Sequence, residues 1–166
     1  MIELKMDFNM GNLSAEVQLW DINLKQFKKA TAIFDTGAHT THIDTHVLKS
    51  LGYDLDNAEI SYINTVGNSK IKINNIVLDN IKIGELELGA TLVNFSELSD
   101  ISSYLILGLN ILKEFNINLD FKNGLISMEP NFDVNSKIPV DKFNKSSSRF
   151  GMWAINEKII EIIQER

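Results

Sequence analysis

The chain contains no cysteine, and this absence excludes both disulfide bonds and metal sites built from thiolates. It has no apolar run close to the roughly 20 residues that a membrane-spanning helix needs. Its first residues, MIELKMDFNMG, alternate charged and apolar side chains and do not resemble a signal peptide. Basic charge is scarce too, since 16 Lys and Arg against 22 Asp and Glu leave a net charge of −6. We therefore expect a soluble, cytoplasmic protein that binds neither nucleic acid nor membrane.

The composition that remains is ordinary for a globular protein. With 166 residues, 44% of them hydrophobic, the chain is long enough to bury a sizeable core. We predict one domain over residues 1–129 and a C-terminal extension over residues 130–166. The extension begins with a polar linker and ends in MWAINEKIIEIIQER, whose isoleucines recur on one face of an amphipathic helix.

Residues 1–129 alternate apolar and polar side chains with the period of two that indicates half-buried strands. A short helix interrupts them in IDTHVLKSLGYD, where Asp44 or Thr45 can cap the start and Gly52 can end the helix. A turn or so of helix also follows Gly108. We predict an all-β domain with short helices, whose strands lie near residues 2–8, 13–19, 25–34, 59–65, 70–78, 80–95 (two strands), 104–107 and 117–128 (a hairpin).

One carboxylate stands where an apolar strand ends. In KKATAIFDTGAHTTHID, residues 28–44, the apolar run leads directly into Asp35, which is followed by Thr36, Gly37 and Ala38. An ionised Asp in an apolar setting costs several kcal/mol unless it is paired, hydrogen-bonded or kept protonated. Either the fold supplies partners for Asp35, or the site performs chemistry.

Two motifs in this order resemble those of the retropepsin-like aspartic proteases, which include the retroviral proteases and bacterial relatives. The first is Ile-Phe-Asp-Thr-Gly-Ala at residues 33–38, and the second is Ile-Leu-Gly-Leu-Asn at residues 106–110, with a glycine-containing hairpin between them. The resemblance covers residues 1–129. It implies an acid-protease β-barrel with one lobe per chain, and the activity of an aspartic endopeptidase without a cofactor.

Aspartic proteolysis requires two carboxylates that share one proton, because two like charges so close together cannot both ionise. The ionised carboxylate takes a proton from water, and the neutral one donates to the developing oxyanion. Only one Asp-Thr-Gly occurs in the chain. The resemblance therefore implies a homodimer in which Asp35 of each protomer meets at the twofold axis and acts on a peptide or protein substrate.

The resemblance also implies roles for other residues. Thr36, Gly37 and Ala38 support the catalytic loop, and the hairpin over residues 59–77 acts as a flap. One departure is that His39 and Leu109 occupy the positions of an acidic residue and an arginine in the viral proteases. The remaining expected site residues are the flap tip (Val66, Gly67, Asn68), the substrate pocket (Ala38, Ile63, Val66, Leu109) and the structural support (Gly108, Asn110).

The sequence leaves two alternatives to an aspartic protease open. His39, His42 and His46 lie close to Asp44 in the sequence, and these residue types bind Zn²⁺. Their spacing is not that of HExxH, and a capping Asp44 would leave His42 outside the helix that carries His46, so surface histidines and no metal site are the favoured interpretation. The other alternative is a retropepsin-like module that dimerises or binds peptides without cutting them.

Overall fold

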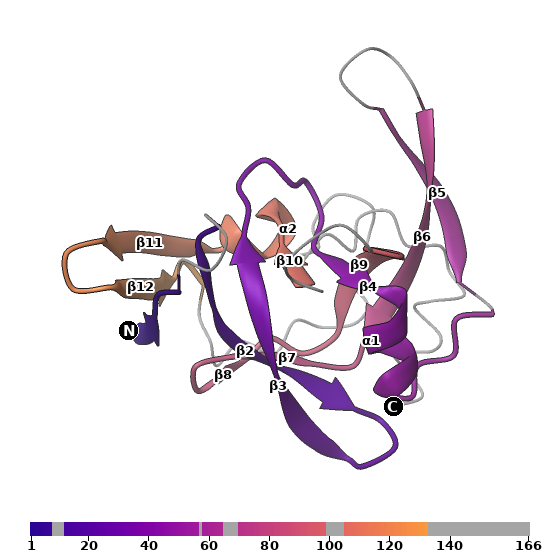
Figure 1. Ribbon diagram of the computed structural model, residues 1–166, viewed down its shortest axis with the longest axis horizontal. Helices are drawn as coiled ribbons and strands as arrows, with labels where there is room; N and C mark the ends of the chain where they lie inside the picture. Colours follow the sequence, from indigo (N-terminus) through magenta and orange to yellow (C-terminus); the bar gives the residue numbers. More distant parts are fainter. Residues whose placement is uncertain (8–11, 57, 65–69, 99–104, 133–166) are drawn as a thin grey trace.

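The structure is a computed structural model (Figure 1), and it describes residues 1–7, 12–56, 58–64, 70–98 and 105–132. The predicted C-terminal helix lies outside these ranges. Within them the chain is mainly β with two short helices, which confirms the predicted fold class. The elements are β1 (Ile2–Lys5), β2 (Ser14–Asp21), β3 (Gln26–Phe34), β4 (His42–Asp44), α1 (Thr45–Ser50), β5 (Glu59–Asn64), β6 (Lys70–Leu78), β7 (Ile81–Ile83), β8 (Leu86–Glu87), β9 (Thr91–Ser96), β10 (Leu105–Leu107), α2 (Leu109–Leu112), β11 (Phe115–Asp120) and β12 (Leu125–Pro130).

The sequence pattern did not predict β4. This strand has only three residues and leads directly into α1, so it is too short to show an alternation. The segment before residue 96 also differs from the prediction, because it forms three strands, β7 to β9, where two were expected. The short β8 pairs with β7 in a tight hairpin that the alternation did not separate from its neighbours.

The strands form two sheets. In the larger sheet the strand order is β5-β6-β9-β4-β10-β3-β2-β7-β8, and in the smaller it is β1-β12-β11. The centre of the larger sheet joins segments far apart in the chain: β10 pairs in parallel with β3, and β4 pairs antiparallel with β10 and in parallel with β9. Because β3 and β10 are parallel, with Phe34 opposite Leu107, the chain leaves both strands at the same end. Asp35 and Gly108 are therefore neighbours.

One face of the central strands packs into the main hydrophobic core. The strand residues that point to this side alternate with those that do not, as the period-two pattern requires. Burial of this apolar surface is the main term that stabilises the sheet. The fully buried members from the central strands are Ala32, Ile43, Val93, Leu105 and Leu107.

Asp44 joins the start of α1 to the end of β9. One carboxylate oxygen accepts from the His46 N–H at 2.7 Å, as an N-cap residue does, and the other accepts from the Leu98 N–H at 2.8 Å. Burial alone would raise the pKa of Asp44, but these N–H donors outweigh burial and hold the pKa below its usual range. The buried charge is thus stabilised by hydrogen bonds to backbone groups.

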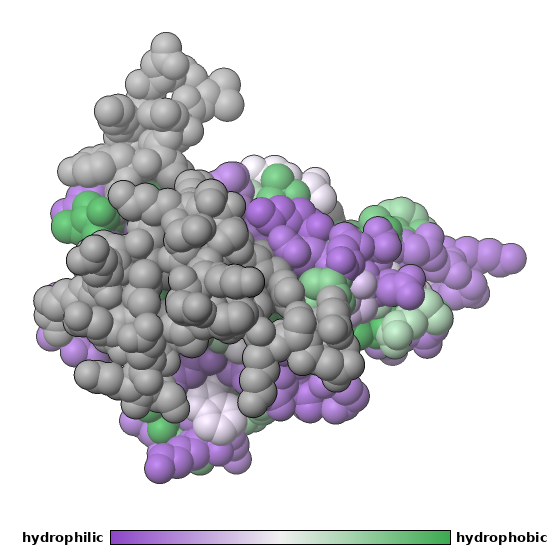
Figure 2. Space-filling model, turned by 180° about the vertical axis from the view of Figure 1, so that it is seen from behind, coloured by the Kyte–Doolittle hydropathy of each residue, from purple (hydrophilic) through white to green (hydrophobic). Residues whose placement is uncertain are grey.

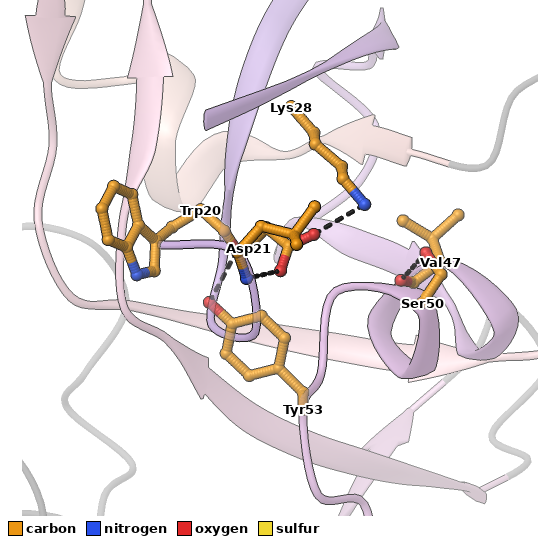
Figure 3. A network of polar contacts seen from close by, with 7 residues as sticks. Trp20, Asp21, Lys28, Val47, Ser50 and Tyr53 are labelled. Atoms are coloured by element: carbon orange, nitrogen blue, oxygen red, sulfur yellow. Dashed lines mark hydrogen bonds and ion pairs between the residues drawn. The ribbon is translucent and has the colours of Figure 1, made fainter. Parts of the chain in front are cut away.

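A second group of polar contacts fixes the far end of the β2–β3 hairpin (Figure 3). The buried carboxylate of Asp21 pairs with Lys28 Nζ at 2.6 Å and accepts from the Leu24 N–H at 2.8 Å. Lys28, more than any other group, lowers the pKa of Asp21. Beside it the Tyr53 hydroxyl donates to the Trp20 carbonyl oxygen at 3.3 Å, so the chain after α1 is held against the end of β2.

The side chain of Asn110 connects three segments at the centre of the sheet. Its Oδ1 accepts from the N–H and the hydroxyl of Thr41, at 2.7 and 2.8 Å. Its Nδ2 donates to the Leu92 carbonyl oxygen at 3.1 Å. Asn110 and Thr41 are both buried, so each of these groups depends on the other for its hydrogen bonds. The sequence analysis expected Asn110 to support the structure, and these hydrogen bonds are the contacts that it makes.

Seen from behind, the described part of the surface is mainly hydrophilic, with small separate hydrophobic patches (Figure 2). Within the described ranges, neither helix has the length and apolar character to cross a membrane.

Replacing Asn110 with Ala should destabilise the fold by about 2 to 4 kcal/mol, because it leaves the buried Thr41 N–H and Leu92 carbonyl without partners. The measurement is the free energy of unfolding in urea. Asn118→Ala, on the exposed side of β11, is the matched control and should change the value by less than about 0.5 kcal/mol. Equal effects of the two changes would contradict the assigned role of Asn110.

The stability contributed by Asp44 should depend on pH. A carboxyl whose pKa is lowered by folding stabilises the folded state above its unfolded pKa of about 3.9, and this contribution is lost as the pH falls through the folded pKa. We therefore expect Asp44→Asn to be destabilising at pH 6 and the gap from wild type to shrink below about pH 4. Unfolding curves across this range test it, with the exposed Asp56→Asn as the control. A gap that stays constant with pH would refute the role of the Asp44 charge.

Candidate active site

Asp35 begins the loop that follows β3, and backbone hydrogen bonds fix its position. Its N–H donates to the Leu107 carbonyl oxygen at 3.1 Å, which continues the pairing of β3 with β10 by one residue. Its own carbonyl oxygen accepts from the Ala38 N–H at 3.2 Å, so residues 35–38 form a tight turn. The side-chain Oδ1 accepts from the Gly37 N–H at 2.8 Å. The fold thus supplies a donor to the partly buried carboxylate.

Two glycines allow the chain to come this close. A Cβ on Gly37 would lie 3.1 Å from Asp35 Oδ1, tighter than an ordinary contact. A Cβ on Gly108 would lie 2.6 Å from the carbonyl carbon of Thr40 and 2.8 Å from the Thr41 nitrogen, where the backbone cannot move aside. Gly108 is therefore required for β10 to pack against the loop between β3 and β4.

The start of α2 is bound to the same loop, which lies beside α2 in Figure 1. The Leu109 N–H donates to the Ala38 carbonyl oxygen at 2.8 Å, and the Asn110 N–H donates to the His39 carbonyl oxygen at 3.1 Å. The Gly108 N–H donates to Thr41 Oγ1 at 3.1 Å. Residues 38–41 and 108–110 are thus held together by two backbone–backbone hydrogen bonds and one bond to the Thr41 hydroxyl. His39 and Leu109 need no ion pair to keep this contact.

The predicted flap corresponds to an antiparallel hairpin that projects from the body of the molecule (Figure 1). In it β5 pairs with β6 from Glu59 opposite Asn75 to Asn64 opposite Lys70. The predicted tip, Val66 to Asn68, lies outside the described residues, and so does the side chain of Ile63. Of the four predicted pocket residues, Ala38 and Leu109 are placed next to each other by their hydrogen bond, and both are half-buried.

The three histidines occupy separate positions. His39 and His46 are exposed, whereas His42 is half-buried on β4 and its Nε2 lies 2.9 Å from Ser96 Oγ. Both oxygens of Asp44 are engaged by backbone N–H groups. In the part of the chain that is described, no three His, Asp or Glu side chains are grouped so that they could hold a metal ion.

Some residues that shape this site were not identified from the sequence. Thr41 is fully buried and hydrogen-bonds to both Asn110 and Gly108, yet three other threonines lie within five residues of it and nothing in the pattern distinguishes it from them. Its importance depends on the three-residue strand β4, which had no sequence signal of its own. The pair of His42 and Ser96 likewise depends on the parallel pairing of β4 with β9.

The fold is shared with a solved structure of another protein. A retropepsin-like aspartic protease from Rickettsia conorii aligns with a TM-score of 0.55 and 21% identity over 76% of this chain and 88% of that one. The retroviral protease-like domain of Ddi1 from Leishmania major aligns with a TM-score of 0.48 and 17% identity over 76% of this chain and 98% of that one. No curated protein sequence matches this chain significantly.

A family model described as gag-polyprotein putative aspartyl protease matches residues 20–114, more than half of the chain. This span contains Asp35 and its loop, the projecting hairpin, and the Gly108–Asn110 segment that holds the loop in place. The matched residues are thus the ones that build the site described above. The chain belongs to the retropepsin-like aspartic protease family.

Proposed function

We propose that the protein is an aspartic endopeptidase in which the Asp35 carboxylates of two protomers activate one water molecule. The observation that carries this proposal is the setting of Asp35. Its carboxylate is half-buried at the end of β3, receives the Gly37 N–H, and adjoins the exposed residues Thr36 and Gly37. The loop is rigidly attached to β10 and α2 behind it, as a catalytic group requires.

The second carboxylate is supplied by a second copy of the chain. Only one Asp-Thr-Gly is present in 166 residues, whereas the chemistry needs two carboxyl groups about 3 Å apart. A twofold axis beside the exposed loop brings the same residue from both protomers together. The exposed Thr36 then faces the partner loop, which explains why a polar side chain stands beside the catalytic group on an open surface.

The reaction follows from a dyad that holds one proton. The ionised Asp35 accepts a proton from water while the water oxygen bonds to the peptide carbonyl carbon. The neutral Asp35 of the other protomer gives its proton to the carbonyl oxygen, and a tetrahedral diol results. A proton then passes to the amide nitrogen, the carbon–nitrogen bond breaks, and a carboxylic acid and an amine leave. The enzyme forms no covalent bond with the substrate.

The substrate is an extended peptide bound between the Asp35 loop and the hairpin of β5 and β6. Ala38 and Leu109 line the cleft beside the catalytic group in this proposal, and the assignment of Ile63 and Val66 to the same pocket rests on the sequence resemblance alone. The sequence resemblance assigns Val66, Gly67 and Asn68, which lie outside the described residues, to the tip of a flap that closes over bound peptide. Residues 1–129 are the catalytic unit in this proposal, and residues 130–166 are an extension of it.

Asp35→Asn should lower the rate of peptide cleavage at least about a thousandfold, because the amide cannot accept the proton of water. The folded state should remain, since the oxygen of an asparagine amide at this position can still accept from the Gly37 N–H. The measurement is a peptide-library digest of wild type against the variant, with Asp56→Asn as a control that cleaves normally. A wild type that binds peptides but cuts no more than Asp35→Asn would identify a non-catalytic module.

If the two carboxylates come from two protomers, the inactive Asp35→Asn variant should inhibit the wild-type protein. Mixed dimers contain a single carboxylate, so an excess of Asp35→Asn protein should inhibit wild type after subunit exchange. Specific activity should also fall on dilution, in step with dissociation of the dimer measured by sedimentation. Activity that is unaffected by both treatments would mean that one chain carries a complete site.

A further inference from the structure

A row of side chains runs across the sheet face that carries Asp35. Residues opposite each other on paired strands point to the same face of a sheet. Five residues stand in such register across β3, β10, β4, β9 and β6: Ile33, Ile106, His42, Asn94 and Asn75. Asp35 follows Ile33 by two positions and continues the same side of the chain.

This face is turned away from the main core. The neighbours of the row along the strands, such as Ile43 and Phe95, belong to the core and point to the opposite side. The polar end of the row lies on β6, the strand that continues into the projecting hairpin, and the other end reaches the Asp35 loop. The row therefore joins the two structures between which the substrate is proposed to bind.

The two asparagines of the row lack the partners that buried amides normally have. Asn75 is 6% exposed and Asn94 is 9% exposed. Within the described structure neither side-chain amide hydrogen-bonds to another residue, whereas Asn110 satisfies its amide on both sides. Among the described side chains, the only polar atom that is fully enclosed and has no hydrogen bond is Asp21 Oδ2, which pairs with Lys28. The amides of Asn75 and Asn94 are therefore not fully enclosed and still reach open space. Amides that no described residue satisfies and that still reach open space are available to hydrogen-bond a bound polar group.

The other groups on this face are neutral or acidic. His42 contacts Ser96, and burial lowers the pKa of His42 more than the nearby Asp44 raises it, so the imidazole is uncharged at neutral pH. Glu59 stands opposite Asn75 on β5 and extends the row with a carboxylate. A bound group here meets hydrogen-bond donors and acceptors without a positive charge from Lys or Arg among these residues.

We propose that Asn75, Asn94 and His42 form a polar subsite that binds a carboxamide side chain, glutamine or asparagine, of the peptide substrate. This inference rests on the proposed protease function. A carboxamide carries both a donor and an acceptor, so it can donate a hydrogen bond to one asparagine amide oxygen and accept one from an asparagine NH₂ group. A carboxylate has no donor to offer and meets the negative charges of Asp44 and Glu59, and an apolar side chain leaves the amides unpaired.

The position of the subsite limits which substrate residue it can bind. Neighbouring strands lie about 4.8 Å apart, so Asn94 is about 14 Å from the strand that leads to Asp35. An extended peptide advances about 3.4 Å per residue, which places the recognised side chain within about four positions of the cleaved bond.

The test uses quenched fluorescent peptides with one cleavable core, in which each of the four positions on either side of the cut carries Gln, Glu or Leu in turn. Gln and Glu have the same shape, and Leu is similar in size without polar atoms. At one position, wild type should cleave the Gln peptide with a kcat/KM about tenfold or more above those of the Glu and Leu peptides.

Asn94→Leu and Asn75→Leu should abolish this preference, so that the ratio of kcat/KM for Gln to Leu falls about tenfold or reverses. The matched control is Asn74→Leu, which neighbours Asn75 on β6 but points to the opposite face and should keep the wild-type ratio. Because the two amides have no partners in the described part of the free protein, their Leu variants should unfold at an unchanged or higher temperature. A lower unfolding temperature would indicate that these amides serve the fold.

The outcomes separate this inference from the proposed function. If wild type cleaves the peptides without preferring Gln at any position, or if the preference survives in both Leu variants, the subsite is refuted and the protease remains. A preference for Glu or for an introduced Lys would also refute it, because the chemistry of the bound group would be different. If wild type cleaves nothing, the proposed function fails, and the subsite fails with it.

Discussion

The contact between residues 35–41 and residues 107–110 is the constraint on which the rest of the site depends. Two strands far apart in the chain, β3 and β10, run in parallel and end together, and the backbone after each one hydrogen-bonds to the other. Gly108 permits this approach because no side chain stands between the two backbones. A carboxylate at the end of β3 is thereby held at a fixed point on the surface, although the loop that carries it contains exposed residues. Rigid support behind an exposed functional group is the arrangement that catalysis requires.

Asparagine side chains have two different roles on this sheet, and the hydrogen bonds that each one makes distinguish these roles. Asn110 uses its oxygen and its nitrogen for partners on two other segments, so its amide is part of the framework. Asn75 and Asn94 are nearly as buried, but no described residue completes their amides. A buried polar group that is satisfied makes a structure specific, whereas one that is unsatisfied costs stability until something binds. The buried carboxylates of Asp44 and Asp21 belong to the framework as Asn110 does, because Asp44 accepts from two backbone N–H groups and Asp21 accepts from the Leu24 N–H and pairs with Lys28.

The contact between the two segments is made mainly by backbone groups and does not depend on charged side chains. At His39 and Leu109 the sequence departs from the acid and arginine that the resemblance led us to expect, yet the N–H and carbonyl groups of the two segments still join. The contact survives because parallel strand pairing and the glycine determine it, and these do not depend on charge. Much of the fold could be predicted because alternation is a local property: it indicated the strands near β2, β3, β6 and β12, and the cap of α1, expected at Asp44 or Thr45, is Asp44. The strand β4 was missed because three residues cannot show a period.

The amino-acid sequence was sufficient to predict the fold class and to identify the single Asp-Thr-Gly and Gly108 within the second motif, because periodicity and turn chemistry are local properties that each segment carries with it. The sequence also shows that each chain contains one carboxylate in an Asp-Thr-Gly motif, that of Asp35. The three-dimensional structure was needed to show which residues surround Asp35. It was also needed to show that Thr41 hydrogen-bonds to Asn110 and that His42, Asn94 and Asn75 stand in one row. Those relations depend on strand order and register between segments tens of residues apart. Local pattern carries no information about register, since a shift of one residue keeps the alternation and reverses the face that each side chain occupies.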